Sequence, residues 1–210
     1  MKKDDTNKIY RELPLKQIPW IFKTPPDILV ELINKGKINP CKTIDLGCGT
    51  GINAIYLASK RFIVTGIDIS PAAIKIAKRN ADEKKVKCNF IIADVLSDLN
   101  EIDRNYDFAY DWELLHHIFP ENRQNYIKNV YNLLNQGGTY LSVSFSEKDS
   151  CFGGQGKYRE TPLGTVLYFS SENELKELFK PFFNIEDLKT IEIRGKPASH
   201  FAIYAFMKRK

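Results

Sequence analysis

Short apolar runs alternate with amphipathic stretches along most of the chain. The runs have the length of strands and are rich in β-branched and aromatic residues; they lie at 43–46, 62–67, 86–93, 106–111, 138–145, 183–194 and 200–207. Strands alternating with helices at this spacing predict a parallel sheet with helices on both faces, and the last two runs predict an adjacent antiparallel pair. We therefore expect an α/β fold with a doubly wound, mostly parallel seven-stranded sheet and an antiparallel last strand.

Capping residues and prolines mark where the helices should begin. A polar N-cap followed by proline, or by glutamate three residues later, occurs at Thr24–Pro25, Ser70–Pro71 and Ser171–Glu174. A helix over 120–136 is expected to stop at Gly137. In contrast, the charged residues 1–10 are expected to be loosely held.

The stretch 42–70 is a strand, a glycine turn, a helix and a second strand. Alternate glycines in Asp45–Gly51 let the backbone pass close to a ligand, and Asp68, at the end of the next strand, could accept from two ribose hydroxyls. The unit predicts a nucleoside site. A dinucleotide fingerprint would need a third glycine where Ile52 stands, and an acid at Asp45 would repel a pyrophosphate and favour a cationic ligand.

The pattern D-x-G-x-G-x-G resembles motif I of the class I S-adenosylmethionine-dependent methyltransferases, and YDFAYDWELLHHI resembles the motif after their fourth strand. The resemblance covers roughly 24–210 and implies the Rossmann-like methyltransferase fold, with S-adenosyl-L-methionine as cofactor. It is loosest at the level of subfamily, where the chain is most similar to the compact small-molecule enzymes of the tellurite-resistance and thiopurine types. The cofactor-binding residues that it implies are Asp45, Gly47, Cys48, Gly49, Gly51, Asp68, Ile69, Asp94, Val95, Asp111 and Trp112.

His116 and His117 are the candidate catalytic bases, because they follow the fourth strand and their ordinary pKa suits proton transfer near neutral pH. The alternative is that one imidazole packs inside and the other faces solvent. Trp112 could flank adenine or be a core aromatic residue.

Two segments are candidates for covering an acceptor. We name residues 1–23 the strap and residues 147–169 the insertion; residues 24–210 form the predicted catalytic domain. Trp20 in the strap, with Phe152 and Tyr158 in the insertion, are the candidate substrate or lid residues. The alternative is that the strap caps the core and the insertion is a tolerated surface loop.

Composition and charge limit the kinds of partner that the protein is expected to bind. The 210 residues suffice for one sizeable core, and no apolar run approaches the roughly 20 residues of a membrane span, which predicts a cytoplasmic protein without a membrane partner. The net charge of +5 comes largely from the chain ends, and the residues after Asp111 lack the Pro-Pro-aromatic signature of nucleic-acid amino methylases, so nucleic acid is disfavoured. The four scattered cysteines have no zinc-ligand spacing, so no metal is expected.

The sequence thus predicts transfer of a methyl group to a small-molecule acceptor by in-line displacement. A regulatory or partner protein that binds the cofactor without turnover is the alternative. The identity of the acceptor and the oligomeric state stay open.

Overall fold

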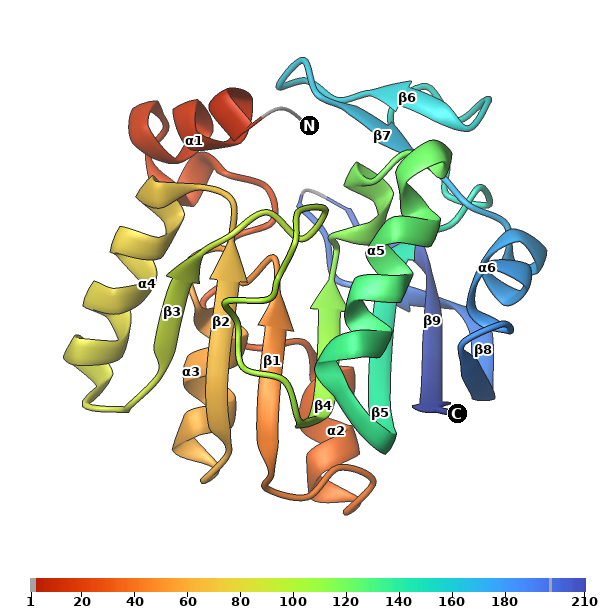
Figure 1. Cartoon of the computed structure of the whole chain (residues 1–210). Helices are drawn as coiled ribbons and strands as arrows, with labels where there is room; N and C mark the ends of the chain where they lie inside the picture. The colour runs from red at the N-terminus through yellow and green to blue at the C-terminus, as the bar shows by residue number, and fades with distance from the viewer. Residues whose placement is uncertain (1–2, 197) are drawn as a thin grey trace.

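The computed structural model describes residues 3–196 and 198–210. Its main sheet has seven strands in the order β3-β2-β1-β4-β5-β9-β8 (Figure 1). The first five run parallel, whereas β9 pairs antiparallel with both β5 and β8. The strands are β1 Lys42–Leu46, β2 Ile63–Asp68, β3 Asn89–Ile92, β4 Tyr106–Trp112, β5 Leu134–Phe145, β8 Phe183–Ile193 and β9 His200–Arg209. The predicted sheet is confirmed, and the last strand of the chain lies inside it.

Helices cover both faces of the sheet, as predicted. Most buried apolar residues of α2, α3 and α4 belong to one cluster, and those of α5 and α6 belong to a second cluster against the opposite face. Ser70 caps α4 by accepting from Ala73 N–H at 3.1 Å, and the Ser171–Glu174 capping box is present on α6. The helices are α2 Asp27–Asn34, α3 Ile52–Ser59, α4 Pro71–Lys84, α5 Pro120–Leu133 and α6 Glu172–Phe179.

Two expected helix ends are wrong. Thr24 does not cap α2, which begins at Asp27, because its hydroxyl instead accepts from Arg194 Nη1 at 3.0 Å. The α5 helix ends at Leu133 rather than at 136, and β5 begins directly at Leu134. In both cases a contact with a distant part of the chain takes the place of the expected helical residues.

The prediction that residues 1–10 are loosely held is also wrong, because α1 spans Lys3–Glu12. Its Ile9 and Tyr10 pack against Ala73 of α4 in a small apolar cluster. Asn7 fixes the same contact, since its Oδ1 accepts from Ala72 N–H at 3.0 Å. After α1 the strap has only one 3₁₀ turn, η1 Leu15–Gln17, and Ile18 is fully buried.

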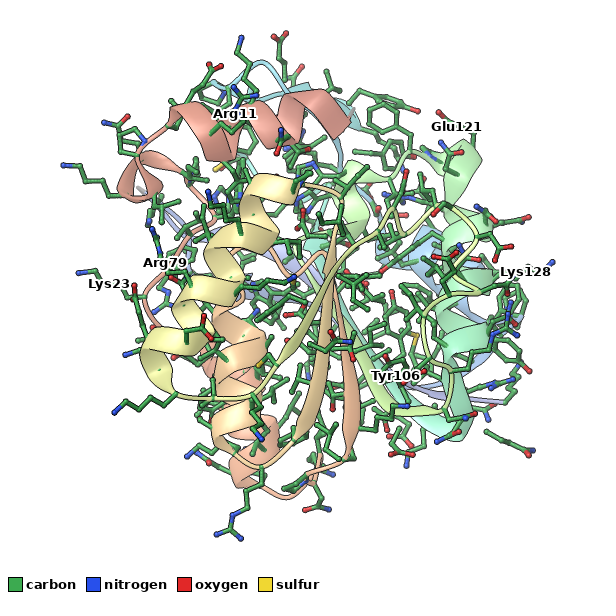
Figure 2. The ribbon with its side chains drawn as sticks, turned by 60° about the vertical axis from the view of Figure 1, so that its left-hand side comes forward. Arg11, Lys23, Arg79, Tyr106, Glu121 and Lys128 are labelled. Carbon is green, nitrogen blue, oxygen red and sulfur yellow. The ribbon has the colours of Figure 1, made fainter. Side chains whose placement is uncertain are left out.

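The insertion forms a small hairpin, β6 Tyr158–Glu160 and β7 Val166–Tyr168, which lies at the same end of the molecule as α1 (Figure 1). Charged side chains extend from separate parts of the chain, as Arg11, Lys23, Arg79 and Lys128 show in Figure 2. Among the described residues, no helix combines the length and the apolar character needed to cross a bilayer.

Candidate active site

A cavity opens at the carboxyl ends of β1, β2 and β4, where ligands bind in sheets of this kind. The turns after these strands and after β3 form its base. The strap and the end of β8 form its sides. The residues that line it are Thr6, Tyr10, Trp20, Ile21, Phe22, Thr24, Pro26, Asp27, Ile28, Gly47, Cys48, Gly49, Thr50, Ile52, Asn53, Asp68, Ile69, Ala93, Asp94, Val95, Leu96, Trp112, Glu113, Leu114, His117, Ile118, Glu192, Ile193 and Arg194.

At the glycine turn, backbone without side chains lines the cavity. Gly47 and Gly49 line it with left-handed φ values of 73° and 52°, which favour glycine. A Cβ at Gly49 would lie 3.0 Å from the Tyr10 hydroxyl, so a side chain there would enter the space beneath α1. Gly51 does not line the cavity; a Cβ there would lie 2.8 Å from the Phe90 ring, which makes Gly51 a packing position.

Asp68 lies at the end of β2 with its carboxylate held by backbone donors. Its Oδ2 accepts from Gly49 N–H at 2.9 Å and its Oδ1 accepts from Ser70 N–H at 2.8 Å. Burial raises the pKa of Asp68, and these two hydrogen bonds partly oppose that shift. One side chain therefore fixes both the glycine turn and the start of α4, while its remaining lone pairs are available to a ligand.

The turn after β3 supplies a second acidic position. Asp94 lines the cavity, and its Oδ1 accepts from Leu96 N–H at 2.9 Å. Among the described residues, no hydrogen bond is made by Asp94 Oδ2, which leaves it as an acceptor beside apolar Val95 and Leu96. Such a site suits a planar ring that carries an amino donor.

Two of the predicted strand-end acids lie outside the cavity lining. Asp111 is fully buried among hydroxyl donors and accepts from Tyr126 at 3.0 Å, from Ser142 at 3.2 Å and from Tyr140. Burial raises its pKa to about 6, although the three hydroxyls act against the shift. Asp45 lies beneath the glycine turn, where burial raises its pKa to about 7. The sequence placed all four acids at one edge, but only Asp68 and Asp94 line the cavity.

The two histidines point into different surroundings. His117 lines the cavity near Trp20, with their ring centroids 6.5 Å apart, and burial lowers its pKa to about 3. His116 does not line it: its ring stacks on Phe145 at 4.2 Å, and its Nδ1 accepts from Phe145 N–H at 3.3 Å. Both imidazoles are therefore neutral and weak bases near pH 7.

Glu113 lines the cavity and was missed by sequence reasoning. It has a φ of 62°, an uncommon conformation for a residue with a side chain, and its N–H donates to Val143 O at 2.8 Å. Burial raises its pKa to about 7, whereas hydrogen bonding from Trp112 and the charge of Arg194 oppose the shift. An acid directly after Asp111-Trp112 was the available signal, and no spacing rule singled it out.

The strap closes one side of the cavity through polar contacts. Trp20 Nε1 donates to the Tyr10 hydroxyl at 2.9 Å, which ties the strap to α1. Arg194, directly after β8, lies 4.6 Å from the Phe22 ring centroid in the strap and donates to Thr24 Oγ1 and Thr24 O, the residue that follows the strap, both at 3.0 Å. Of the three candidate lid residues, Trp20 lines the cavity, whereas Phe152 and Tyr158 do not.

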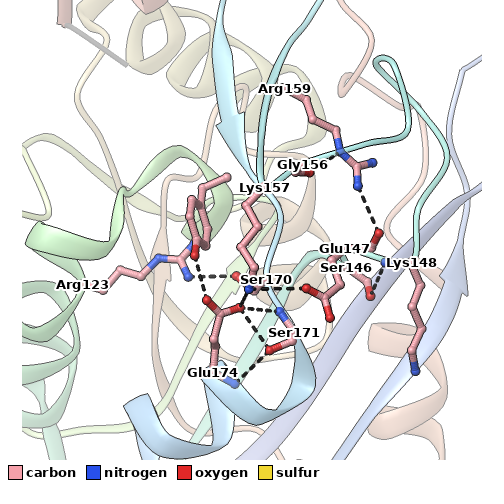
Figure 3. A network of polar contacts seen from close by, with 11 residues as sticks. Arg123, Ser146, Glu147, Lys148, Gly156, Lys157, Arg159, Ser170, Ser171 and Glu174 are labelled. Carbon is pink, nitrogen blue, oxygen red and sulfur yellow. Dashed lines mark hydrogen bonds and ion pairs between the residues drawn. The ribbon is translucent and has the colours of Figure 1, made fainter.

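Two buried arginines fix the insertion, one from within and one at its junction with the body (Figure 3). Arg159, only 3% exposed, donates to the carbonyls of residues 147, 149, 151 and 156. Arg123 donates to Ile118 O at 2.7 Å and to Ser170 Oγ at 2.8 Å, which joins the turn after His117 to the end of β7. At the hairpin tip, Leu163 packs against the apolar cluster of α1.

Comparison with known proteins identifies this arrangement. Residues 44–138 match the family model described as a methyltransferase domain. The chain is 27% identical over 171 residues to a 2-heptyl-1-hydroxyquinolin-4(1H)-one methyltransferase of Mycobacteroides abscessus, covering 81% of this chain and 70% of that protein. These matches identify a class I S-adenosylmethionine-dependent methyltransferase domain.

Two further similarities agree with the methyltransferase assignment. A probable S-adenosyl-L-methionine-dependent methyltransferase, TehB of Haemophilus influenzae, is 34% identical over 151 residues; the match covers 71% of this chain but only 48% of TehB, so the chain spans about half of that relative. A structure solved in work on converting a disulfide bond into a thioacetal group during echinomycin biosynthesis superposes with a TM-score of 0.84 at 26% identity, covering 99% of this chain and 92% of that one.

The methyltransferase's cofactor is S-adenosyl-L-methionine, and the cavity fits it. The glycine turn offers space that a Cβ at residue 49 would fill. Asp68 and Asp94 present carboxylate acceptors, and Trp112 with Val95 and Leu96 presents apolar surface. This combination suits a ligand with a hydroxylated sugar, an aromatic base and a positive centre.

Proposed function

We propose that this methyltransferase transfers the methyl group to a small, largely apolar acceptor with an ionisable hydroxyl or comparable group, and that Glu113 takes the acceptor's proton. The observation that carries this proposal is the position of Glu113 in the cavity with a pKa raised to about 7. A base is most effective when its pKa is close to the working pH, which favours Glu113 over His117, whose pKa is about 3.

The walls around Glu113 support an acceptor with an aromatic body. Trp20, Phe22 and Trp112 line the cavity with Leu114 and Ile118, and the polar side chains of His117 and Arg194 belong to the same lining. Such a lining suits a flat apolar molecule oriented by one or two polar contacts. The acceptor named for the Mycobacteroides abscessus relative is an N-hydroxylated quinolone with a heptyl chain, which has this character.

The chain's own residues would hold, orient and shield the reactants. The bound cofactor supplies a methyl group already activated on a sulfonium. Asp68 would hold the ribose hydroxyls, the backbone of Gly47–Gly49 the amino-acid part, and Asp94 with Val95 the adenine. Glu113 would accept the proton as the acceptor atom attacks in line, and no covalent nucleophile on the protein is needed.

The strap and the insertion would exclude water from this reaction, which is the proposed role of the predicted strap and lid. Their contacts support it: the strap lines the cavity, and Leu163 at the tip of the insertion packs against the cluster of α1. The cytoplasm stays the predicted location. Both relatives named above are methyltransferases, which gives the non-catalytic alternative no support.

Replacing Glu113 tests the proposal. With 2-heptyl-1-hydroxyquinolin-4(1H)-one as the first acceptor probe, Glu113→Gln should lower kcat by about 100-fold or more, because general bases contribute this much. Formation of S-adenosylhomocysteine measures turnover. A carboxylate accepts a proton only when ionised, so wild-type kcat/KM should rise with pH through about 7.

The Glu113→Gln variant also shows whether the pH dependence of turnover comes from Glu113 or from the acceptor. A rising limb due to Glu113 should vanish in Glu113→Gln, whereas a limb due to ionisation of the acceptor would persist. His117→Asn is the comparison variant and should retain the limb. Cofactor affinity of Glu113→Gln, measured by titration calorimetry, should stay within about twofold of wild type. Unchanged kcat in the folded Gln variant would refute the assignment of Glu113.

A further inference from the structure

Three metal-ligating side chains meet outside the active-site cavity. Asp149 and Cys151 come from the start of the insertion, and His200 is the first residue of β9. One ligand atom from each, a carboxylate oxygen, Sγ and an imidazole nitrogen, lies within 4.8 Å of the other two. Residues about 50 positions apart in the sequence thus converge, which a search for closely spaced ligands overlooks.

The histidine is oriented toward the carboxylate without a hydrogen bond. His200 Nδ1 is buried, makes no hydrogen bond among the described residues, and lies 3.4 Å from Asp149 Oδ2. Phe145 and Phe152 hold the imidazole ring, with centroid separations of 4.8 Å and 6.0 Å. A buried imidazole nitrogen that lies beside a carboxylate oxygen without a hydrogen bond can be satisfied by a cation bound to both atoms.

Asp149 is buried, and backbone N–H donors hold both of its carboxylate oxygens in place. It is 2% exposed, its Oδ1 accepts from Cys151 N–H at 2.7 Å, and its Oδ2 accepts from Phe201 N–H at 2.6 Å. Each carboxylate oxygen has two lone pairs, so a further bond is available on either. Backbone donors to a ligating carboxylate orient it, as supporting hydrogen bonds do around protein metal sites.

Arg159 pre-forms the loop that carries the two ligands. Its guanidinium donates to Asp149 O at 2.5 Å and to Cys151 O at 3.2 Å, and it lies 4.0 Å from the Phe169 ring centroid. The loop is therefore held by a buried side chain before any ion binds. Burial raises the pKa of the Cys151 thiol, the hydrogen bond and charge of Asp149 add to this rise, and the Arg159 charge opposes it by a smaller amount.

The distances between the three ligand atoms are close to those in a tetrahedral zinc site. With Zn–N and Zn–O of about 2.0–2.2 Å and Zn–S of about 2.3 Å, tetrahedral ligand atoms lie about 3.4–3.6 Å apart. The nitrogen to oxygen distance of 3.4 Å already matches. Rotation of the half-buried Cys151 side chain can supply the remaining approach, which is at most about 1.4 Å given the 4.8 Å limit.

We propose that Asp149, Cys151 and His200 bind one Zn²⁺ or a similar borderline-soft divalent cation, and that the ion clips the insertion to the start of β9. Thiolate, imidazole and carboxylate together are a zinc-type donor set that leaves a fourth position for water. On binding, the Cys151 S–H bond breaks, its proton passes to the buffer, and a metal–thiolate bond forms. The site does not depend on the proposed acceptor.

Metal titration of the full chain tests the proposed metal site. Protein freed of metal with a chelator should bind Co²⁺ with one-to-one stoichiometry and show the near-ultraviolet absorption of a cobalt thiolate, and Zn²⁺ should displace it. Saturating Zn²⁺ should raise the melting temperature by about 5 °C or more, as expected for a ligand that binds only the folded state. Neither measurement uses methyl transfer, so the outcome is independent of the proposed function.

Matched variants assign the ligands. Cys151→Ser and His200→Gln should each weaken the metal at least about tenfold, and Cys151→Ser should also remove the thiolate absorption. Cys88→Ser is the control, because Cys88 is another half-buried thiol, hydrogen-bonded to Ala54 O at 3.6 Å, and it should behave like wild type. The absence of one-to-one binding in the wild type, or binding that is unchanged in both ligand variants, would overturn the proposal.

Discussion

The floor and the roof of the active-site cavity are built by different means. The floor, residues 45–51, 68–70 and 93–96, is set by turns and by hydrogen bonds within the strand-turn-helix-strand unit 42–70, such as those that Asp68 accepts from Gly49 N–H and Ser70 N–H. The roof, which we propose to consist of residues 3–23 and 147–169, is held by long side chains that reach distant backbone, as when Lys196 donates to Ile21 O. The floor therefore follows from local sequence, whereas the roof follows from tertiary contacts.

This difference bears on function. A floor made of backbone can bind the same cofactor whatever molecule is methylated, since it presents few side chains. A roof held by side chains at a few points can change shape without disturbing the sheet. We expect variants of the floor to alter cofactor affinity and variants of the roof to alter turnover, and the predictions below test that division.

The largest expected effect is at the floor. Gly49→Val should weaken S-adenosylmethionine about 100-fold or more, because a branched side chain at a φ of 52° would occupy the space below the Tyr10 hydroxyl, 3.0 Å from the new Cβ. Such a loss corresponds to roughly 2.7 kcal/mol of binding free energy. Titration calorimetry on the folded variant measures it.

Gly137→Val is the matched control for this variant. Gly137 has a similar left-handed φ of 73°, but a Cβ there meets nothing within 4 Å. The Gly137→Val variant should therefore have a similar backbone strain but leave the cofactor site open, and its affinity for the cofactor should be near that of wild type. Equal losses in the two variants would show that strain rather than ligand space explains the glycine turn.

The same division explains what the sequence predicted. The seven strands and the α4 start at Ser70 follow from periodicity and capping over a few residues, and the structure has them. The α1 helix was mispredicted because its polar sequence predicts disorder in isolation. Its stability comes from Ile9 and Tyr10 packing on Ala73, a contact with a helix about 60 residues away.

Site residues were harder to predict for a related reason. The ends of the parallel strands converge at one edge of the sheet, but the face of the sheet from which a side chain projects alternates along each strand. Asp111 therefore points away from the cavity, toward Tyr126 and Tyr140. Glu113 gains its position from a backbone with a φ of 62°, which no residue preference indicates. The Asp149–His200 contact depends on the β5–β9 pairing and so on the whole sheet.

A second, smaller effect is expected at Asp68. Asp68→Ala should weaken S-adenosylmethionine by on the order of 2 kcal/mol, about 30-fold, through loss of the ribose contact. The side chain also accepts from Gly49 N–H and Ser70 N–H, so the alanine variant loosens the turn as well. Asp68→Asn keeps one amide oxygen as acceptor and should lose less. Unchanged affinity in a folded alanine variant, or tighter binding of NAD than of S-adenosylmethionine by wild type, would contradict the floor assignment.

The smallest effect is expected at the roof, at the tip of the insertion. Leu163→Asp should lower kcat about fivefold and leave cofactor affinity unchanged, because a charge there weakens its apolar contact with the α1 cluster by roughly 1 kcal/mol and favours an open roof. Val166→Asp is the matched control, since Val166 lies on the same hairpin and is already 38% exposed. Hydrogen exchange of residues 158–168 should quicken in Leu163→Asp more than in the control. If both variants turn over the quinolone probe as fast as wild type, the insertion is a surface loop and the roof consists of the strap alone.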